Sequence, residues 1–186
     1  MSRFNVVCRM LVVSLAVLTG CIAAPVTPEP QPEPQPVGAM TVFVVRHAEK
    51  EATGTDPALT AAGQQRAAAL RDRLQSHPVA AAYTTDTLRT RSTIEPLATA
   101  RGLVPRIYDP SQQSALARRL REEHPGQTVV VVGHSNTVLP LIEALGAARP
   151  VATLTDADYD YLFEVTRQAD GMVTAQVHRY GASPAP

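Results

Sequence analysis

Two histidines follow closely after short apolar runs that are typical of buried strands. Each is the second residue after its run, His47 after residues 40–45 and His134 after residues 128–132. A β-branched run without polar alternation predicts a strand that is covered on both faces. In open α/β sheets, ligands bind at the carboxyl ends of the strands, so we expect both histidines to line one pocket.

The chemistry that such a pair supports is transfer of a phosphoryl group. A neutral imidazole attacks phosphorus when one ring nitrogen faces the phosphate and a hydrogen bond fixes the other. We assign this nucleophilic role to His47 and expect His134, as an imidazolium, to add positive charge beside the phosphoryl oxygens. Arg46 and Arg89 each offer a planar fork of donors to the same oxygens. Donors that are fixed in advance lower the barrier electrostatically, by roughly 3 to 4 kcal/mol for one donor.

The elements that must position these side chains alternate between strands and helices. Apolar residues at three- and four-residue spacing after Thr60, a helix cap, predict a first helix with one buried face. Gly102 and Gly146 are expected to end two later helices. Strands are predicted over residues 40–45, 79–83, 104–108 and 128–132, and further helices over residues 87–101, 111–123 and 137–145.

The last part of the chain predicts a hairpin. Residues 159–166 and 172–180 have strand character and flank the turn signal Asp170-Gly171. The alternation before them favours a mostly parallel sheet with helices on both faces. With 186 residues, 45% of them hydrophobic, the chain has room for one ordinary domain. We therefore predict a three-layer α/β/α fold with a mostly parallel central sheet and a C-terminal edge hairpin, over residues 40–181.

Four segments, in the same order, resemble the landmarks of the histidine phosphatase (phosphoglycerate-mutase-like) superfamily. Residues 44–49 (VVRHAE) resemble its Arg-His-Gly signature, with Ala in place of the usual Gly. Residues 59–65 (LTAAGQQ) are similar to a Leu-Thr landmark followed by a Gly in the first helix. Residues 83–93 resemble a third landmark, in which an Arg precedes a small residue and a Thr. Residues 130–136 (VVVGHSN) are similar to the second-histidine motif.

The resemblance implies a phosphoglycerate-mutase-like fold and hydrolysis of a small phosphorylated substrate through a phosphohistidine on His47. It implies a catalytic role for His134 and phosphate binding by Arg46, Arg89 and Asn136. Neither a metal nor a cofactor is expected, because no carboxylates or cysteines lie at ligand spacing around either histidine. Specificity is expected in three loops, residues 50–57, 109–113 and 149–158.

The proton donor to the leaving alcohol is the least specified role. Directly after the second histidine the chain has Ser135, where acid phosphatases of the superfamily carry an Asp. Glu49, Asp86 and Asp109 lie near predicted strand ends, and a carboxylic acid in a pocket can have a raised pKa that suits it to donate. Among these we favour Glu49 as the third catalytic residue.

Two alternative functions stay open. A catalytically silent module that binds phosphate-bearing envelope molecules would keep Arg46 and Arg89 and would need no nucleophile. Removal of phosphate from phosphohistidine on a protein, as compact relatives do, would meet few substrates outside the cytoplasm. A mutase is disfavoured, because about 140 residues leave little room for the loops that grip a substrate carboxylate.

The first 39 residues are expected to export the domain and anchor it to a bacterial membrane. Residues 1–20 have the form of a signal peptide, with an apolar run shorter than the roughly 20 residues that span a bilayer. Residues 18–21 (LTGC) resemble a lipobox, which would make Cys21 the lipidated first residue. Ile22 after it is not the Asp linked to inner-membrane retention, which favours an outer membrane.

Residues 21–39 are expected to form a proline-rich tether that reaches up to roughly 50 Å from the membrane, and residues 182–186 a short tail. Removal of residues 1–20 leaves 15 basic residues against 17 acidic ones, a formal charge of about −2. Nucleic acid is therefore not an expected partner. The expected partners are a small phosphorylated substrate and, through the lipid anchor, a membrane.

Overall fold

The computed structural model describes residues 38–183, and these form a six-stranded sheet with four helices. The predicted signal peptide, Cys21, nearly all of the tether and the end of the tail lie outside the described residues. The elements in chain order are β1 (Met40–Arg46), α1 (Ala61–Arg73), β2 (Val79–Thr84), α2 (Leu88–Arg101), β3 (Arg106–Ile107), α3 (Gln113–Glu123), β4 (Thr128–Gly133), α4 (Ser135–Leu145), β5 (Tyr161–Arg167) and β6 (Val173–Arg179).

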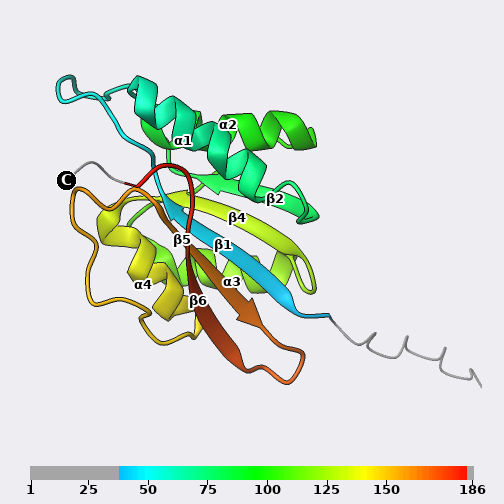
Figure 1. The fold of residues 1–186 in the computed structure, drawn as a ribbon. Coiled ribbons are helices and arrows are strands. Elements are labelled where there is room, and N and C mark those ends of the chain that lie inside the picture. Colours follow the sequence, from blue (N-terminus) through cyan, green and yellow to red (C-terminus); the bar gives the residue numbers. More distant parts are fainter. Residues whose placement is uncertain (1–37, 184–186) are drawn as a thin grey trace, which may run out of the picture. The chain divides into compact units, whose positions relative to one another are not determined.

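The sheet has the strand order β3-β2-β4-β1-β5-β6. The first four of these strands run parallel, whereas β5 is antiparallel to both β1 and β6. Helices α1 and α2 lie on one face of the sheet and α3 and α4 on the other (Figure 1). The predicted three-layer α/β/α fold with a C-terminal edge hairpin is confirmed.

Strand β1 is covered on both faces, which explains its uninterrupted apolar sequence. Val42 and Val44 pack with apolar residues of α3 and α4, whereas Phe43 and Val45 pack with those of α1 and α2. Each of these side chains is almost completely buried. Burial of an apolar side chain of this size stabilises the folded state by about 1.5 to 3 kcal/mol. The packing on both faces fixes the end of β1, and with it the position of the residues that follow.

Helix α1 begins against the loop that follows β1. Thr60 is its N-cap, and the Thr60 hydroxyl accepts a hydrogen bond from the Gly63 N–H at 3.1 Å. The Thr60 N–H donates to the Glu49 carbonyl at 3.0 Å. A Cβ atom at position 63 would lie 2.1 Å from the same carbonyl oxygen, so only glycine allows this approach.

The boundaries of β3, α4 and α3 differ from the prediction for identifiable reasons, and β5 also begins two residues later than predicted. The strand predicted over residues 104–108 is only two residues long, because Val104 is exposed and Pro105 has no N–H to donate to a ladder. Helix α4 begins two residues earlier than predicted, because His134 caps it and the Thr137 hydroxyl accepts from the His134 N–H. Helix α3 begins at Gln113, two residues late, after a turn in which Asp109 accepts from Ser111.

None of the helices between residues 38 and 183 is both long enough and apolar enough to cross a membrane.

Candidate active site

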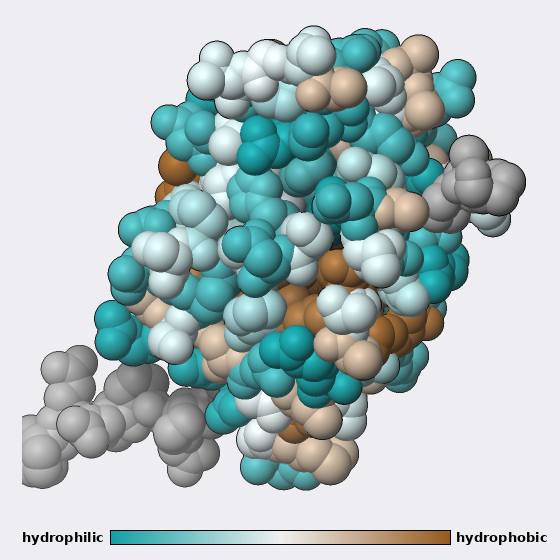
Figure 2. All heavy atoms as spheres, turned by 90° about the vertical axis from the view of Figure 1, so that its left-hand side faces the viewer, coloured by the Kyte–Doolittle hydropathy of each residue, from teal (hydrophilic) through white to brown (hydrophobic). Residues whose placement is uncertain are grey.

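The two predicted histidines meet at the edge of the sheet that is formed by the carboxyl ends of β1 and β4. Arg46 pairs with Gly133 in the β1–β4 register, and the His47 N–H donates to the Gly133 carbonyl at 2.9 Å. The centroids of the His47 and His134 rings are 5.5 Å apart. The predicted convergence of both strand ends is therefore confirmed. In Figure 1, β1 points toward the face that Figure 2 shows, where hydrophilic side chains predominate.

A pocket of about 630 Å³ opens at this edge. Its lining includes five of the six predicted catalytic and phosphate-binding residues; Glu49 is the one that does not line it. The lining residues are Arg46, His47, Lys50, Thr87, Arg89, Pro110, Ser111, His134, Ser135, Asn136, Thr137 and Asp156. Asn136 lies exposed in the first turn of α4.

His47 is held in the form that a nucleophile needs. Its Nδ1 lies 2.8 Å from the Ala48 carbonyl oxygen, which only accepts, so Nδ1 carries the ring proton. Burial lowers the pKa of His47 to about 3, with Arg46, His134 and Arg89 adding to the effect and the Ala48 hydrogen bond opposing it. The ring is therefore neutral at neutral pH, and Nε2 is its unprotonated nitrogen.

His134 is also neutral in the protein alone. Burial and, to a lesser extent, the charges of Arg89 and Arg46 together lower its pKa to about 4. Its Nε2 lies 2.9 Å from the Thr85 hydroxyl, which bonds in turn with the Thr90 hydroxyl. In the ligand-free pocket, burial and the two guanidinium groups disfavour the imidazolium form of His134, and its charge beside a bound phosphoryl group stays a prediction.

Arg46 is buried and is held by the loop between α4 and β5. Its Nη1 donates to the carbonyls of Thr155 and Asp156, at 2.8 and 3.1 Å. Its guanidinium carbon lies 4.2 Å from the centroid of the Tyr159 ring, and that ring is also 6.0 Å from the His47 ring. Tyr159 was not predicted in the site, although the loop before it was predicted to determine specificity.

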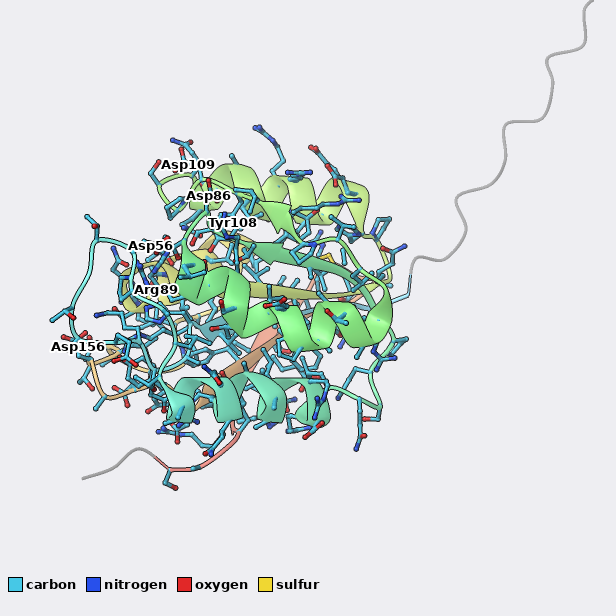
Figure 3. All side chains as sticks on the ribbon, turned by 90° about the horizontal axis from the view of Figure 1, so that it is seen from above. Asp56, Asp86, Arg89, Tyr108, Asp109 and Asp156 are labelled. Atoms are coloured by element: carbon cyan, nitrogen blue, oxygen red, sulfur yellow. The ribbon has the colours of Figure 1, made fainter. Side chains whose placement is uncertain are left out.

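Arg89 projects from the first turn of α2. Its Nη1 lies 3.4 Å from Asp56, whose carboxylate also accepts from the Leu88 N–H (Figure 3). The Nε atoms of Arg46 and Arg89 are both buried and have no hydrogen-bond partner among residues 38–183. Buried donors of this kind need an acceptor, and an oxyanion in the pocket would supply one.

The Glu49 carboxylate faces away from the pocket and binds Arg66. The Arg66 Nε donates to both carboxylate oxygens at 2.9 Å, and its Nη2 donates to Oε1 at 2.6 Å. Arg66 is buried, and it also donates to the carbonyls of Tyr180 and Ala182. Glu49 thus joins the loop after His47 to helix α1 and the C-terminal segment.

The other two predicted acid candidates also lie outside the pocket lining. Asp86 forms an ion pair with Arg91. Asp109 accepts hydrogen bonds from the N–H and the hydroxyl of Ser111, both at 2.8 Å, and these bonds lower its pKa. Figure 3 shows both aspartates on the same side of the domain as Arg89.

Buried Thr93, the last residue of the third family-like segment, joins the loop after His47 to the first turn of α2. The Thr93 hydroxyl accepts from the Ala48 N–H at 2.9 Å and donates to the Arg89 carbonyl at 2.7 Å. The hydroxyl therefore fixes the distance between the loop after β1 and the first turn of α2. In the part of the chain that the structure describes, no group of three or more His, Cys, Asp or Glu side chains is arranged to hold a metal ion.

Comparison with known proteins agrees with this geometry. Residues 42–113 match the model of the histidine phosphatase superfamily (branch 1). No curated protein sequence matches the chain significantly.

Three proteins of different description are among the solved structures with the same fold. The protein histidine phosphatase SixA complexed with tungstate is 20% identical, with 77% of this chain and 97% of that chain covered and a TM-score of 0.59. A mycobacterial glucosyl-3-phosphoglycerate phosphatase is 14% identical, with 78% and 100% covered and a TM-score of 0.59. A phosphoglycerate mutase from Bacillus anthracis is 15% identical, with 77% and 94% covered and a TM-score of 0.59.

At these identities the structural likeness shows the fold, whereas the family model covers the segment that carries His47 and Arg89. The described residues thus share the phosphoglycerate-mutase-like fold, and residues 42–113, less than half of the chain, match the model of the histidine phosphatase superfamily, branch 1.

Proposed function

We propose that this protein hydrolyses small phosphomonoesters through a phosphohistidine on His47. The observation that carries the proposal is the state of the His47 ring. The ring is neutral, its Nδ1–H is bound to the Ala48 carbonyl, and its unprotonated Nε2 belongs to a pocket that Arg46 and Arg89 also line. This combination supplies a nucleophile and an oxyanion site together.

The reaction proceeds in two steps. Nε2 of His47 attacks the phosphorus atom while the phosphoryl oxygens accept hydrogen bonds from the two guanidinium groups, and the leaving oxygen departs with a proton. Water then attacks the phosphohistidine, and the nitrogen–phosphorus bond breaks to release inorganic phosphate. The unpartnered Nε atoms of Arg46 and Arg89 support this binding mode, because phosphoryl oxygens would satisfy both.

The same observation weighs against a catalytically silent binding module, which needs cations but no neutral imidazole with a fixed tautomer. The pocket volume of about 630 Å³ lies in the range that is common for small-molecule sites. Two similar structures are described as phosphatases, one of a protein histidine and one of glucosyl-3-phosphoglycerate. They support phosphatase chemistry but do not distinguish a small substrate from a protein substrate.

The test is turnover of 4-nitrophenyl phosphate by the full chain in detergent, with a chelator present. We expect turnover that His47→Asn lowers at least about 10³-fold, because covalent catalysis is lost. The matched control is His178→Asn, which removes a histidine that pairs with Glu164 on the terminal hairpin. Folded parent protein without turnover, or equal turnover in the His47 variant, would reject the proposal.

A further inference from the structure

The proposed hydrolysis requires a proton donor for the leaving oxygen, and the structure assigns this role to Asp156. The inference rests on the proposed function and adds a catalytic residue to it. Asp156 belongs to the loop between α4 and β5. Among the described residues, it is the one Asp or Glu that lines the pocket.

Five other carboxylates near this edge of the sheet are each held by a different partner, and none of these five lines the pocket. A carboxylate that already accepts several hydrogen bonds is poorly placed to donate a proton to a substrate. The pairs are Glu49 with Arg66, Asp56 with Leu88 and Arg89, Asp86 with Arg91, Asp109 with Ser111, and Asp158 with Thr155.

Asp156 combines a fixed backbone with a free side chain. Its carbonyl accepts from Arg46 Nη1, and the turn around it is closed by Asp158, which accepts from the N–H and hydroxyl of Thr155 at 2.7 and 2.6 Å. Its carboxylate is fully exposed and has one weak contact, at 3.5 Å from Arg46 Nη2. Figure 3 shows Asp156 on a separate loop from Asp86 and Asp109.

This placement puts the carboxyl group beside an arginine that binds the phosphoryl group. The leaving oxygen is bonded to the same phosphorus atom, so it lies within reach of a side chain that turns inward from the pocket rim.

In the first step, His47 Nε2 forms a bond to phosphorus and the bond between phosphorus and the leaving oxygen breaks. The electron pair stays on that oxygen, which takes the proton of Asp156 and leaves as an alcohol. In the second step, the Asp156 carboxylate takes a proton from water as the water oxygen attacks phosphorus. The phosphorus–nitrogen pair returns to His47, and inorganic phosphate is released.

The dependence of kcat/KM on the leaving group tests this role. We compare the full-length parent with Asp156→Asn on 4-nitrophenyl phosphate, whose leaving group needs no proton, and on phenyl phosphate, whose leaving group does. General acid catalysis is worth about 10² to 10⁴-fold. We expect Asp156→Asn to lower kcat/KM for phenyl phosphate by about 10²-fold or more, and for 4-nitrophenyl phosphate by less than about 3-fold. Asp72→Asn, at an exposed carboxylate of α1 that pairs with Arg71 and lies outside the pocket lining, is the control and should change neither value.

Three results would overturn the assignment: equal losses on both substrates, no loss on either, or a parent that cleaves only the nitrophenyl ester. In each of these cases turnover of 4-nitrophenyl phosphate by the parent still upholds the phosphatase itself. A parent that cleaves neither ester overturns the proposed function, and this assignment with it.

Discussion

At the scale of single residues, burial and two neighbouring guanidinium groups decide how the histidines titrate. The pKa of His47 is about 3 and that of His134 about 4, against 6.5 for an exposed histidine. An exposed imidazole is usually protonated in mild acid and can then no longer act as a nucleophile. Here burial, together with the charges of Arg46, His134 and Arg89, keeps the proposed nucleophile unprotonated in mild acid.

We expect the stability of the protein to fall as the pH falls from about 6.5 toward 4. In this range the unfolded chain binds protons at both histidines, whereas the folded chain does not. Each histidine contributes a slope of up to about 1.4 kcal/mol per pH unit. Urea unfolding in phosphate-free buffers would measure this slope, and His47→Asn should flatten it. An unchanged slope in that variant would contradict the burial of a neutral His47.

We expect phosphate binding to depend on the planar geometry of the Arg46 and Arg89 guanidinium groups as well as on their charge. Arg46→Lys and Arg89→Lys keep the positive charge but remove the planar fork and the unpartnered Nε. We expect each variant to weaken competitive inhibition by inorganic phosphate by about 10-fold or more, which corresponds to about 1.4 kcal/mol. Arg71→Lys, at an exposed arginine that pairs with Asp72, should leave the inhibition constant unchanged. Similar inhibition constants in all the variants would argue against bidentate binding.

At the scale of elements, helix α1 and the loop after β1 form one unit. The backbone of Glu49 lies against Gly63, and the Glu49 side chain is held by Arg66 one turn further along the same helix. Thr93 ties Ala48 to α2 in the same way. These contacts hold the Ala48 carbonyl that sets the tautomer of His47. The packing of α1 and α2 therefore influences which nitrogen of His47 carries the proton.

Gly63→Ala should therefore affect both stability and turnover. The new Cβ would lie 2.1 Å from the Glu49 carbonyl oxygen, so α1 or the loop must move. Overpacking of this kind typically costs about 1 to 3 kcal/mol. We expect a loss of unfolding free energy of that size in urea titrations, with a lower kcat/KM. Gln64→Ala, at the exposed next position of α1, is the control and should stay within about 0.5 kcal/mol of the parent.

At the scale of the whole molecule, both cysteines of the chain, Cys8 and Cys21, precede the described domain. The domain therefore has no disulfide to rely on, and the two apolar clusters on either face of its sheet stabilise it. Export and lipid anchoring through Cys21 stay predictions, since residues 1–37 lie outside the described part. The lipobox-like segment is the observation that supports them.

The anchor can be tested directly in a bacterial host. We expect the full chain to incorporate labelled palmitate and to fractionate with membranes, because an acylated Cys21 inserts its chains into the bilayer. Cys21→Ser should lose the label and leave the membrane fraction, whereas Cys8→Ser should keep both properties. Label in the Cys21 variant, or none in the parent, would refute the lipid anchor.

The sequence by itself determined most of the elements and the two histidines that line the pocket. Uninterrupted apolar runs located β1 and β4, and the second residue after each run was a histidine of the pocket. These features are local, because burial on both faces of a parallel strand shows directly in its composition. The short β3 was the weakest prediction, since an edge strand with one partner has little apolar pattern to reveal its length.

Only the tertiary structure decided which carboxylate meets which cation. Glu49, predicted as the acid, binds the buried Arg66, whereas Asp156 reaches Arg46 although the two are 110 residues apart in the chain. The contacts depend on how distant loops and helices pack on the sheet, and no pattern within either segment encodes them. The same packing also lowers the pKa of His134, because it buries the ring beside Arg46 and Arg89.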